Sequence, residues 1–340
     1  MANVILAALL GMLLAIVAGP KFIEFLRKNE LGQHIREEGP AGHRVKQGTP
    51  TMGGLLFIIA AAIPFLALSD YTLRGLTVFA VMVGCAAIGF ADDFTKLTRR
   101  RSLGLAGRWK LLLLVAITFF VGWAVNEEDL STDVYVPGLD LDVDLWWIWY
   151  LLLFLIVAGA ANGVNLTDGI DGLAAGTGMI ALITFTAINI FTFIRLGQRD
   201  LPRDDFLDMA ILGGALIGAV IGFLWYNAFP AEVIMGDTGS MAIGGALAAF
   251  AIMTKTELLL LLIGGIFLIE ALSVILQVVS FKYWGRRIFL MAPIHHHFEM
   301  KAWSETKIMV RFWILSAILC AAAFGLYYEY FFDFRDLPAP

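Results

Sequence analysis

The stretch LLLLVAITFFVGWAV, residues 111–125, has no charged side chain and is typical of a helix that crosses a membrane. Such a helix needs roughly 20 mostly apolar residues. Outward from this stretch, the chain contains ten apolar runs, separated by short polar segments that carry nearly all of its charge. The runs are centred near Leu10, Ala61, Val81, Thr118, Leu153, Thr184, Leu216, Leu247, Phe267 and Leu319. They do not alternate apolar and polar residues as barrel strands would. We therefore predict an all-α integral membrane protein, a bundle of ten transmembrane helices.

The composition of the whole chain excludes an ordinary soluble globular domain. Of its 340 residues, 59% are hydrophobic and 16% are charged, whereas soluble domains have about 45–50% apolar and about 25% charged residues. Cys85 and Cys320 both lie inside apolar runs, so we expect buried small side chains rather than a disulfide or a metal pair. We predict a single polytopic membrane domain over residues 1–340.

Lysine and arginine predict the orientation, because short cytoplasmic loops carry an excess of both. The loops after the first, third and ninth runs are rich in them, whereas residues 126–144 hold seven acids and no base. The loop after the sixth run, with Arg195, Arg199 and Arg203, weakens this bias without reversing it. We therefore expect both termini outside and the odd-numbered loops in the cytoplasm. These cytoplasmic loops cover about 19–53, 92–109, 162–171, 226–238 and 282–306.

The acidic outer loop has the pattern of two short strands. Apolar and polar residues alternate on both sides of Pro137 and Gly138, and such alternation around a turn is typical of a hairpin. We predict a small β-hairpin in the outer loop near 133–144.

Two adjacent carboxylates end the third apolar run, in GFADDFTK, residues 89–96. Asp92 and Asp93 repel each other, so this placement calls for a cation partner, and we expect Mg²⁺ or a substrate proton there. The alternative is a helix end at the membrane interface, with both acids reaching solvent. Lys96 lies one turn further on and could pair with Asp92 or bind phosphate.

Two further cytoplasmic segments carry oxygen ligands. In NGVNLTDGIDGLA, residues 162–174, Asn165, Asp168 and Asp171 recur every three residues among glycines. Glycine lets the backbone approach a ligand, and amide and carboxylate oxygens are hard ligands; a plain turn is the alternative. Asp237, in MGDTGS, residues 235–240, stands at a helix entrance. It is there either an N-cap or a metal ligand that faces the other acids.

Two lysines fit anionic groups. Lys46 precedes the glycine-rich turn of KQGTPTMGG, residues 46–54, which leads into a helix N-terminus and so suits a phosphate. The sequence lacks the G-x-x-x-x-G-K-[ST] pattern of a P-loop. Lys110 is either an interface anchor or a second phosphate contact.

Three histidines stand side by side in APIHHHFE, residues 292–299, and all five histidines of the chain lie in predicted cytoplasmic loops. Adjacent ligands on one short stretch rarely reach one zinc ion. The triplet instead favours recognition of phosphate and sugar, because an imidazole donates or accepts a proton near neutral pH.

The polar residues of the cytoplasmic loops together predict phosphoryl transfer. Acids for Mg²⁺, with Lys and His for phosphates, supply the positioning and charge neutralisation that this chemistry needs. One substrate should be a lipid, because the site opens at the membrane surface. A transporter, the alternative from another class, would hold its acids at mid-membrane in broken helices.

Six motifs resemble, in order, those of the phospho-N-acetylmuramoyl-pentapeptide transferase family, within the superfamily of polyprenyl-phosphate N-acetylhexosamine-1-phosphate transferases. They are GTPTMGG, GFADDFTK, NGVNLTDGIDGLA, MGDTGS, LSVILQV and MAPIHHHFE. The similarity runs from about Gly19 to Phe312, and the histidine triplet distinguishes this family from its sister transferases. The resemblance implies transfer of phospho-MurNAc-pentapeptide from UDP-MurNAc-pentapeptide to undecaprenyl phosphate, giving lipid I and UMP. The alternative is a polyprenyl-phosphate GlcNAc-1-phosphate transferase.

The resemblance also implies roles for residues that match the motifs. Mg²⁺ would bind Asp237 and Asn165, and Asp92 would be the base, with Asp93 in support. The catalytic residues it implies are Asp92, Asp93, Asp237 and His295. The substrate-binding residues it implies are Lys46, Lys96, Lys110, Asn162, Asp168, Asp171, Asn227, Gln277, His296 and His297.

Partners and location follow from the same resemblance. Besides its two substrates, the chain would contact bilayer lipids, form a homodimer and bind uridine-containing antibiotics as inhibitors, and no nucleic acid is expected. It would lie in the bacterial plasma (inner) membrane, with the active site on the cytoplasmic side.

Overall fold

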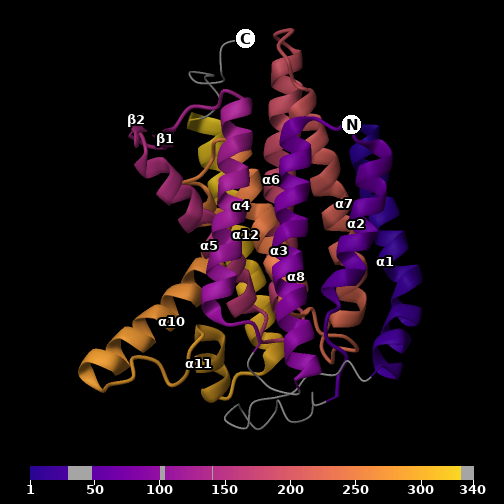
Figure 1. The fold of residues 1–340 in the computed structure, drawn as a ribbon, viewed down its shortest axis with the longest axis vertical. Coiled ribbons are helices and arrows are strands. Elements are labelled where there is room, and N and C mark those ends of the chain that lie inside the picture. The colour runs from indigo at the N-terminus through magenta and orange to yellow at the C-terminus, as the bar shows by residue number, and fades with distance from the viewer. Residues whose placement is uncertain (30–47, 100–103, 140, 331–340) are drawn as a thin grey trace.

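The structure, a computed structural model, describes residues 1–29, 48–99, 104–139 and 141–330, and it is a bundle of helices with one small hairpin (Figure 1). The helices are α1 Ala2–Lys28, α2 Gly54–Leu68, α3 Leu73–Thr98, α4 Gly107–Glu127, α5 Ile148–Thr167, α6 Leu173–Gly197, α7 Asp204–Asn227, α8 Gly236–Met253, α9 Leu260–Ile263, α10 Gly265–Trp284, α11 Ile294–Met300 and α12 Glu305–Tyr330.

Each of the ten predicted centres lies inside a helix, but the ten predicted spans are shown only in part. Within the described residues, nine helices are long and apolar enough to cross a membrane. The second run forms α2, which has 15 residues and contains Pro64. Its length of about 22 Å is shorter than a hydrocarbon core of roughly 30 Å. Nine candidate spans indicate a multi-pass membrane protein, and the tenth stays a prediction.

Helix α8 lies at the centre of the bundle, and all of its residues from Thr238 to Met253 are buried. Small residues allow neighbouring helices to approach it closely. A Cβ at Gly244 would lie 2.4 Å from the Ala160 carbonyl oxygen, and one at Gly245 would lie 2.7 Å from Cys85 Sγ. Cys85 and Cys320 are both buried and unpaired, as the sequence predicts.

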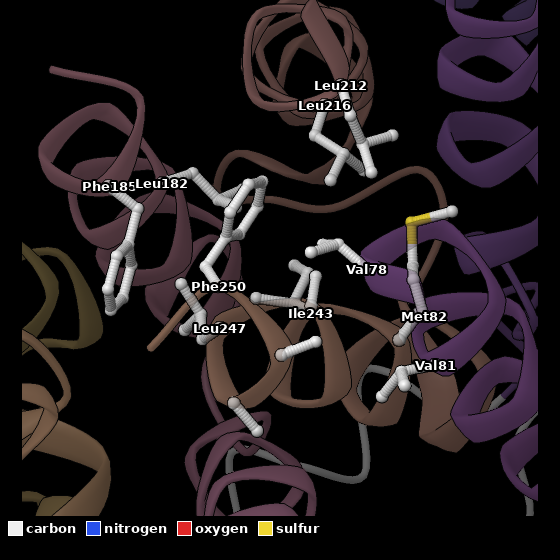
Figure 2. Close-up of a cluster of buried hydrophobic side chains, with 14 of the residues drawn as sticks. Val78, Val81, Met82, Leu182, Phe185, Leu212, Leu216, Ile243, Leu247 and Phe250 are labelled. Carbon is white, nitrogen blue, oxygen red and sulfur yellow. The ribbon is translucent and has the colours of Figure 1, made fainter. Parts of the chain in front are cut away.

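Figure 2 shows apolar side chains of α3, α6 and α7 packed with those of α8. Helix α8 contributes Ile243, Leu247 and Phe250, and the rings of Phe250 and Phe185 of α6 stack with centroids 5.9 Å apart. Helix α6 also supplies Leu182, and the other labelled residues are Val78, Val81 and Met82 of α3 and Leu212 and Leu216 of α7. This packing sets the position of α8 relative to α3, and so of the polar residues at the ends of both.

The predicted hairpin is present, as strands β1 Asp133–Val136 and β2 Leu141–Asp144. The strands are antiparallel, with Val134 opposite Val143. The hairpin lies at the end of the bundle where α1 begins (Figure 1).

The helices extend further into the predicted loops than the hydropathy indicates. Helix α1 continues to Lys28 and α3 continues to Thr98, past the expected loop starts near residues 19 and 92, and the bounds of the cytoplasmic loops stay a prediction. The histidine triplet lies on the short helix α11, directly after Pro293, rather than on an irregular loop. Charged residues at these helix ends lower the hydropathy without ending the helix.

Candidate active site

Three aspartates from two helices meet at the end of the bundle opposite the hairpin. Asp92 and Asp93 lie near the end of α3, and Asp237 lies in the first turn of α8. One carboxylate oxygen from each lies within 4.8 Å of the others. The close approach depends on Gly89, where a Cβ would be 2.1 Å from the Asp237 carbonyl oxygen.

Two lysines bridge these carboxylates. Lys96 Nζ lies 2.7 Å from Asp92 Oδ2 and 2.9 Å from Asp237 Oδ1. Lys110 Nζ, from the first turn of α4, lies 2.9 Å from Asp92 Oδ1 and 3.0 Å from Asp237 Oδ2. Three carboxylates against two ammonium groups leave an excess of one negative charge when all five are ionised. This group of five residues is called the aspartate–lysine cluster below.

Asp93 is bound mainly by the start of α8. Its Oδ1 accepts from the Asp237 N–H at 3.2 Å, and its Oδ2 accepts from the Thr238 N–H at 2.9 Å and the Thr238 hydroxyl at 2.7 Å. A carboxylate at a helix N-terminus satisfies free N–H groups and complements the helix dipole. Asp93 therefore ties α3 to α8 and orients Asp237.

Asp92 is held from the opposite side by the segment that precedes α4. The Leu105 N–H donates to Asp92 Oδ1 at 2.7 Å. A Cβ at Gly104 would lie 2.3 Å from the same oxygen, so a side chain there would displace the carboxylate. Asp92 is only 1% exposed, and a ligand would reach it only after a lysine has moved.

Asn165 and Asp168, near the end of α5, face the first turn of α8. The Asn165 amide nitrogen donates to Ser240 Oγ at 3.1 Å, and the amide oxygen takes no part in this bond. The Gly236 backbone N–H lies close to the Asp168 carboxylate and favours its charged form. Burial raises the pKa of Asp168 well above its ordinary value, and the negative charges of Asp237 and Asp93 raise it further.

Three other predicted substrate-binding residues hold backbone segments together. Asp171 Oδ2 accepts from the Ala231 N–H at 3.0 Å. Asn227 accepts from the Gly172 N–H at 3.1 Å and donates to the Val233 carbonyl at 2.9 Å. Gln277 accepts from two N–H groups of the segment after α10, those of Ile288 and Phe289, and donates to the Phe289 carbonyl, each at 3.0 Å.

The three histidines have three different environments. His295 is fully buried, and its Nδ1 lies 3.1 Å from Glu270 Oε1. His296 Nδ1 contacts Glu299 within α11. His297 Nδ1 accepts from the Leu290 N–H at 3.1 Å, and burial, followed by the charge of Lys301, lowers its pKa. These contacts run to α10, to α11 itself and to the segment before α11.

Asn162 has no described contact with the aspartate–lysine cluster. Asn162 is exposed and donates to the Ala158 carbonyl of its own helix at 2.7 Å. Lys46, like His34 and His43, lies outside the described residues.

The sequence analysis missed two polar residues that the structure places near predicted ones. Glu270, the buried partner of His295, is an acid inside an apolar run, and such residues are functional candidates in membrane helices. Thr238, which binds Asp93, directly follows Asp237, but its role depends on how α3 packs against α8.

Comparison with known proteins gives matches over most of the chain. The family model for glycosyl transferase family 4 matches residues 75–255. A signature of phospho-N-acetylmuramoyl-pentapeptide-transferase, its signature 1, matches residues 46–58.

Curated relatives extend the similarity to almost the full length. A phospho-N-acetylmuramoyl-pentapeptide-transferase of Rubrobacter xylanophilus is 44% identical over 340 residues, which cover 98% of this chain and 99% of the relative. That of Halalkalibacterium halodurans is 44% identical over 95% of this chain and 97% of its own length. That of Bacillus subtilis is 42% identical over 96% of this chain and 98% of its own length.

Proposed function

The chain belongs to the phospho-N-acetylmuramoyl-pentapeptide transferase family, and from this premise we propose that it transfers phospho-MurNAc-pentapeptide from UDP-MurNAc-pentapeptide to undecaprenyl phosphate. The products are lipid I, a precursor of peptidoglycan, and UMP. The observation that carries the proposal is the aspartate–lysine cluster at one end of a membrane-spanning bundle. A transfer between a water-soluble donor and a lipid acceptor needs a charged site at such a place.

The residues of the cluster fit a divalent cation. Carboxylate oxygens are the hard ligands that Mg²⁺ prefers, and Mg²⁺ needs only one or two of them beside substrate phosphates. We propose that Asp237 is the principal ligand, with Asn165 and the neighbouring aspartates as further oxygen donors. When bound, the ion would neutralise charge on the donor's diphosphate.

The two lysines are placed to exchange carboxylate partners for phosphates. Lys96 and Lys110 each touch Asp92 and Asp237, and their side chains are 32% and 21% exposed. When a diphosphate enters, we propose that both ammonium groups turn toward it. Asp92 then loses its lysine partners and can accept the proton of the lipid phosphate, which attacks the donor directly.

The remaining groups would bind the donor and the inhibitors that resemble it. Asp168 and the loop held by Asp171 and Asn227 would contact the uridine part, and His296 and His297 would lie on the sugar side. Uridine-containing antibiotics would compete at this place. We also propose a homodimer in the bacterial plasma membrane.

A transfer assay with purified protein in detergent tests the activity. The mixture contains Mg²⁺, undecaprenyl phosphate and either radiolabelled UDP-MurNAc-pentapeptide or UDP-GlcNAc. We expect labelled lipid and UMP with the first donor only. Transfer from UDP-GlcNAc alone would assign the chain to the sister transferases, and transfer from neither would reject the reaction.

Orientation is tested separately by labelling cysteines in intact cells. We propose that the cluster faces the cytoplasm, because the donor is made there. Leu139, in the hairpin, is 73% exposed, and Ala106 lies beside the cluster. Leu139→Cys should react with a membrane-impermeant maleimide and Ala106→Cys should not, while buried Cys85 and Cys320 add little background. The reverse pattern would contradict the orientation.

A further inference from the structure

Glu270 is a buried acid in a part of α10 that has no other charged residue. It is the one charged residue between positions 265 and 281, and its side chain has no exposed surface. An ionisable group in a membrane helix is costly, and such groups nearly always face a partner. The partner here is His295 of α11, which is also fully buried.

Both carboxylate oxygens of Glu270 face His295. The imidazole Nδ1 lies 3.1 Å from Oε1, and the main-chain N–H of His295 donates to Oε2 at 3.4 Å. The contact joins α11 to α10, two helices that lie beside each other at the edge of the bundle (Figure 1). Because neither side chain is exposed, neither reaches a substrate directly.

The other ring nitrogen of His295 lies against the loop that carries Asp168. A Cβ at Gly169 would be 2.3 Å from His295 Nε2, so only glycine fits at this position. The Gly236 backbone N–H lies close to the carboxylate of Asp168, the neighbour of Gly169, and Gly236 precedes Asp237. A continuous series of contacts therefore leads from Glu270 through His295, Gly169 and Asp168 to the start of α8.

We propose that Glu270 and His295 are positioning residues, which together hold Gly169 in place and so fix the Asp168 carboxylate beside the aspartate–lysine cluster for binding of the nucleotide donor. The proposal rests on the proposed function for the identity of the donor. His295, which the sequence suggests as a catalytic residue, acts on this view through the loop rather than on the reacting atoms.

Kinetics of Glu270 variants separate positioning from mere packing. A loop displaced by about 1 Å costs on the order of 10²-fold in activity, so Glu270→Ala should lower kcat/KM by about that factor, mainly through a higher KM for UDP-MurNAc-pentapeptide. Glu270→Gln keeps an acceptor for the His295 N–H and should recover to within about tenfold of wild type.

The matched control is Glu257→Ala. Glu257 is another buried glutamate, but it lies near the hairpin and pairs with Lys255. Its variant should keep the wild-type KM. A Glu270→Ala variant with wild-type KM and kcat, or one no worse than Glu257→Ala, would overturn the proposal.

A double-mutant cycle tests the contact itself. Gly169→Ala should reduce kcat/KM strongly in the wild-type background, because the new methyl group collides with His295 Nε2. In a His295→Ala background the same methyl has room, so Gly169→Ala should cost much less there. Residues in contact give non-additive effects, and additive losses would reject the link.

Hydrogen exchange gives a readout that does not depend on turnover. Amides of residues 165–172 should exchange faster in Glu270→Ala and His295→Ala than in wild type and Glu257→Ala. Unchanged exchange would reject positioning, even if the wild-type enzyme is active. If the variants exchange faster but the wild-type protein shows no transfer activity, the proposed function is rejected and the positioning role is still supported.

Discussion

One group of acids and lysines lies at the start of α8 and another lies just after its end, and the two groups differ in how their charges are matched. Near the hairpin, Lys255 Nζ contacts Glu257 Oε1 at 3.0 Å and donates to the carbonyl oxygens of Ser131 and Asp133 at 2.9 and 2.8 Å. One acid meets one base, and backbone carbonyls take the other two N–H donors. Every strong donor of Lys255 already has a partner.

At the other end, two lysines are shared among three carboxylates from two helices. Because the carboxylates are in excess and each lysine contacts two of them, either lysine can give up one carboxylate and keep an ion pair with the other. A buried acid by itself is therefore a weak sign of a functional site, whereas buried acids that outnumber their bases can accept a cation.

The largest effect is expected from Asp237→Asn. This change removes the proposed main Mg²⁺ ligand and should lower kcat/KM by roughly 10³–10⁵-fold, the scale of a charge-stabilising group in phosphoryl transfer. The measurement is the transfer assay across Mg²⁺ concentrations, with elution from a sizing column as the check on folding. Near-normal activity at ordinary Mg²⁺ would remove Asp237 from the metal site.

Asp92→Asn should have the next largest effect. Loss of a general base lowers kcat by roughly 10²–10⁴-fold, and the acidic limb of the pH–rate profile should shift while donor binding persists. A covalent route predicts something different, because protein incubated with labelled donor and no lipid would release UMP and keep the label. Stoichiometric label that disappears in Asp237→Asn would rule out direct attack by the lipid.

Gly104→Ala should have an intermediate effect. A Cβ there would lie 2.3 Å from Asp92 Oδ1, so the carboxylate must move. We expect kcat to fall by roughly 10-fold to 10²-fold with little change in KM for the donor, since misplacement of a reacting group costs on this scale. Gly107→Ala is the control, because open space surrounds that position. Equal activities of the two variants would show that Asp92 needs no such support.

Lys255→Met should leave catalysis unchanged and reduce stability. Removing one partner of a buried pair costs up to roughly 3–5 kcal/mol, because the other charge stays buried. Burial already raises the pKa of Glu257, and Lys255 opposes that rise. A folded-state pKa above the unfolded value of about 4.3 means that stability falls as pH rises through the interval between them. The loss of Tm in Lys255→Met should therefore be larger at pH 7.5 than at pH 5. If the loss of Tm is the same at both pH values, it would instead come from lost packing of Lys255 against Trp149.

Several site residues could be predicted from the sequence because they interrupt apolar runs. Asp92, Asp93 and Asp237 stand at run ends, and the structure brings these three together. The same pattern does not tell what a polar atom binds. Asn227 and Gln277 have the chemistry of substrate ligands, yet their described hydrogen bonds hold backbone segments, because an amide serves either purpose.

Glu270 is a polar residue that the sequence reveals without revealing its partner. An acid inside an apolar run is visible in the sequence, but its partner His295 is 25 residues away and on another helix. Only the packing of α11 against α10 brings the two together, and only the fit of the imidazole against Gly169 links them to Asp168.

Length and hydropathy are local properties of the chain, and for that reason they alone specified the helices, their approximate centres and the small hairpin. Even so, α2 has only 15 residues, fewer than the roughly 20 that a membrane span needs. The approach of α3 to α8 determines which acids share a lysine. Coulomb interactions in the site depend on distances of a few ångströms, here between residues about 145 positions apart in the chain. Those distances follow from how small residues such as Gly89 let two helices pack.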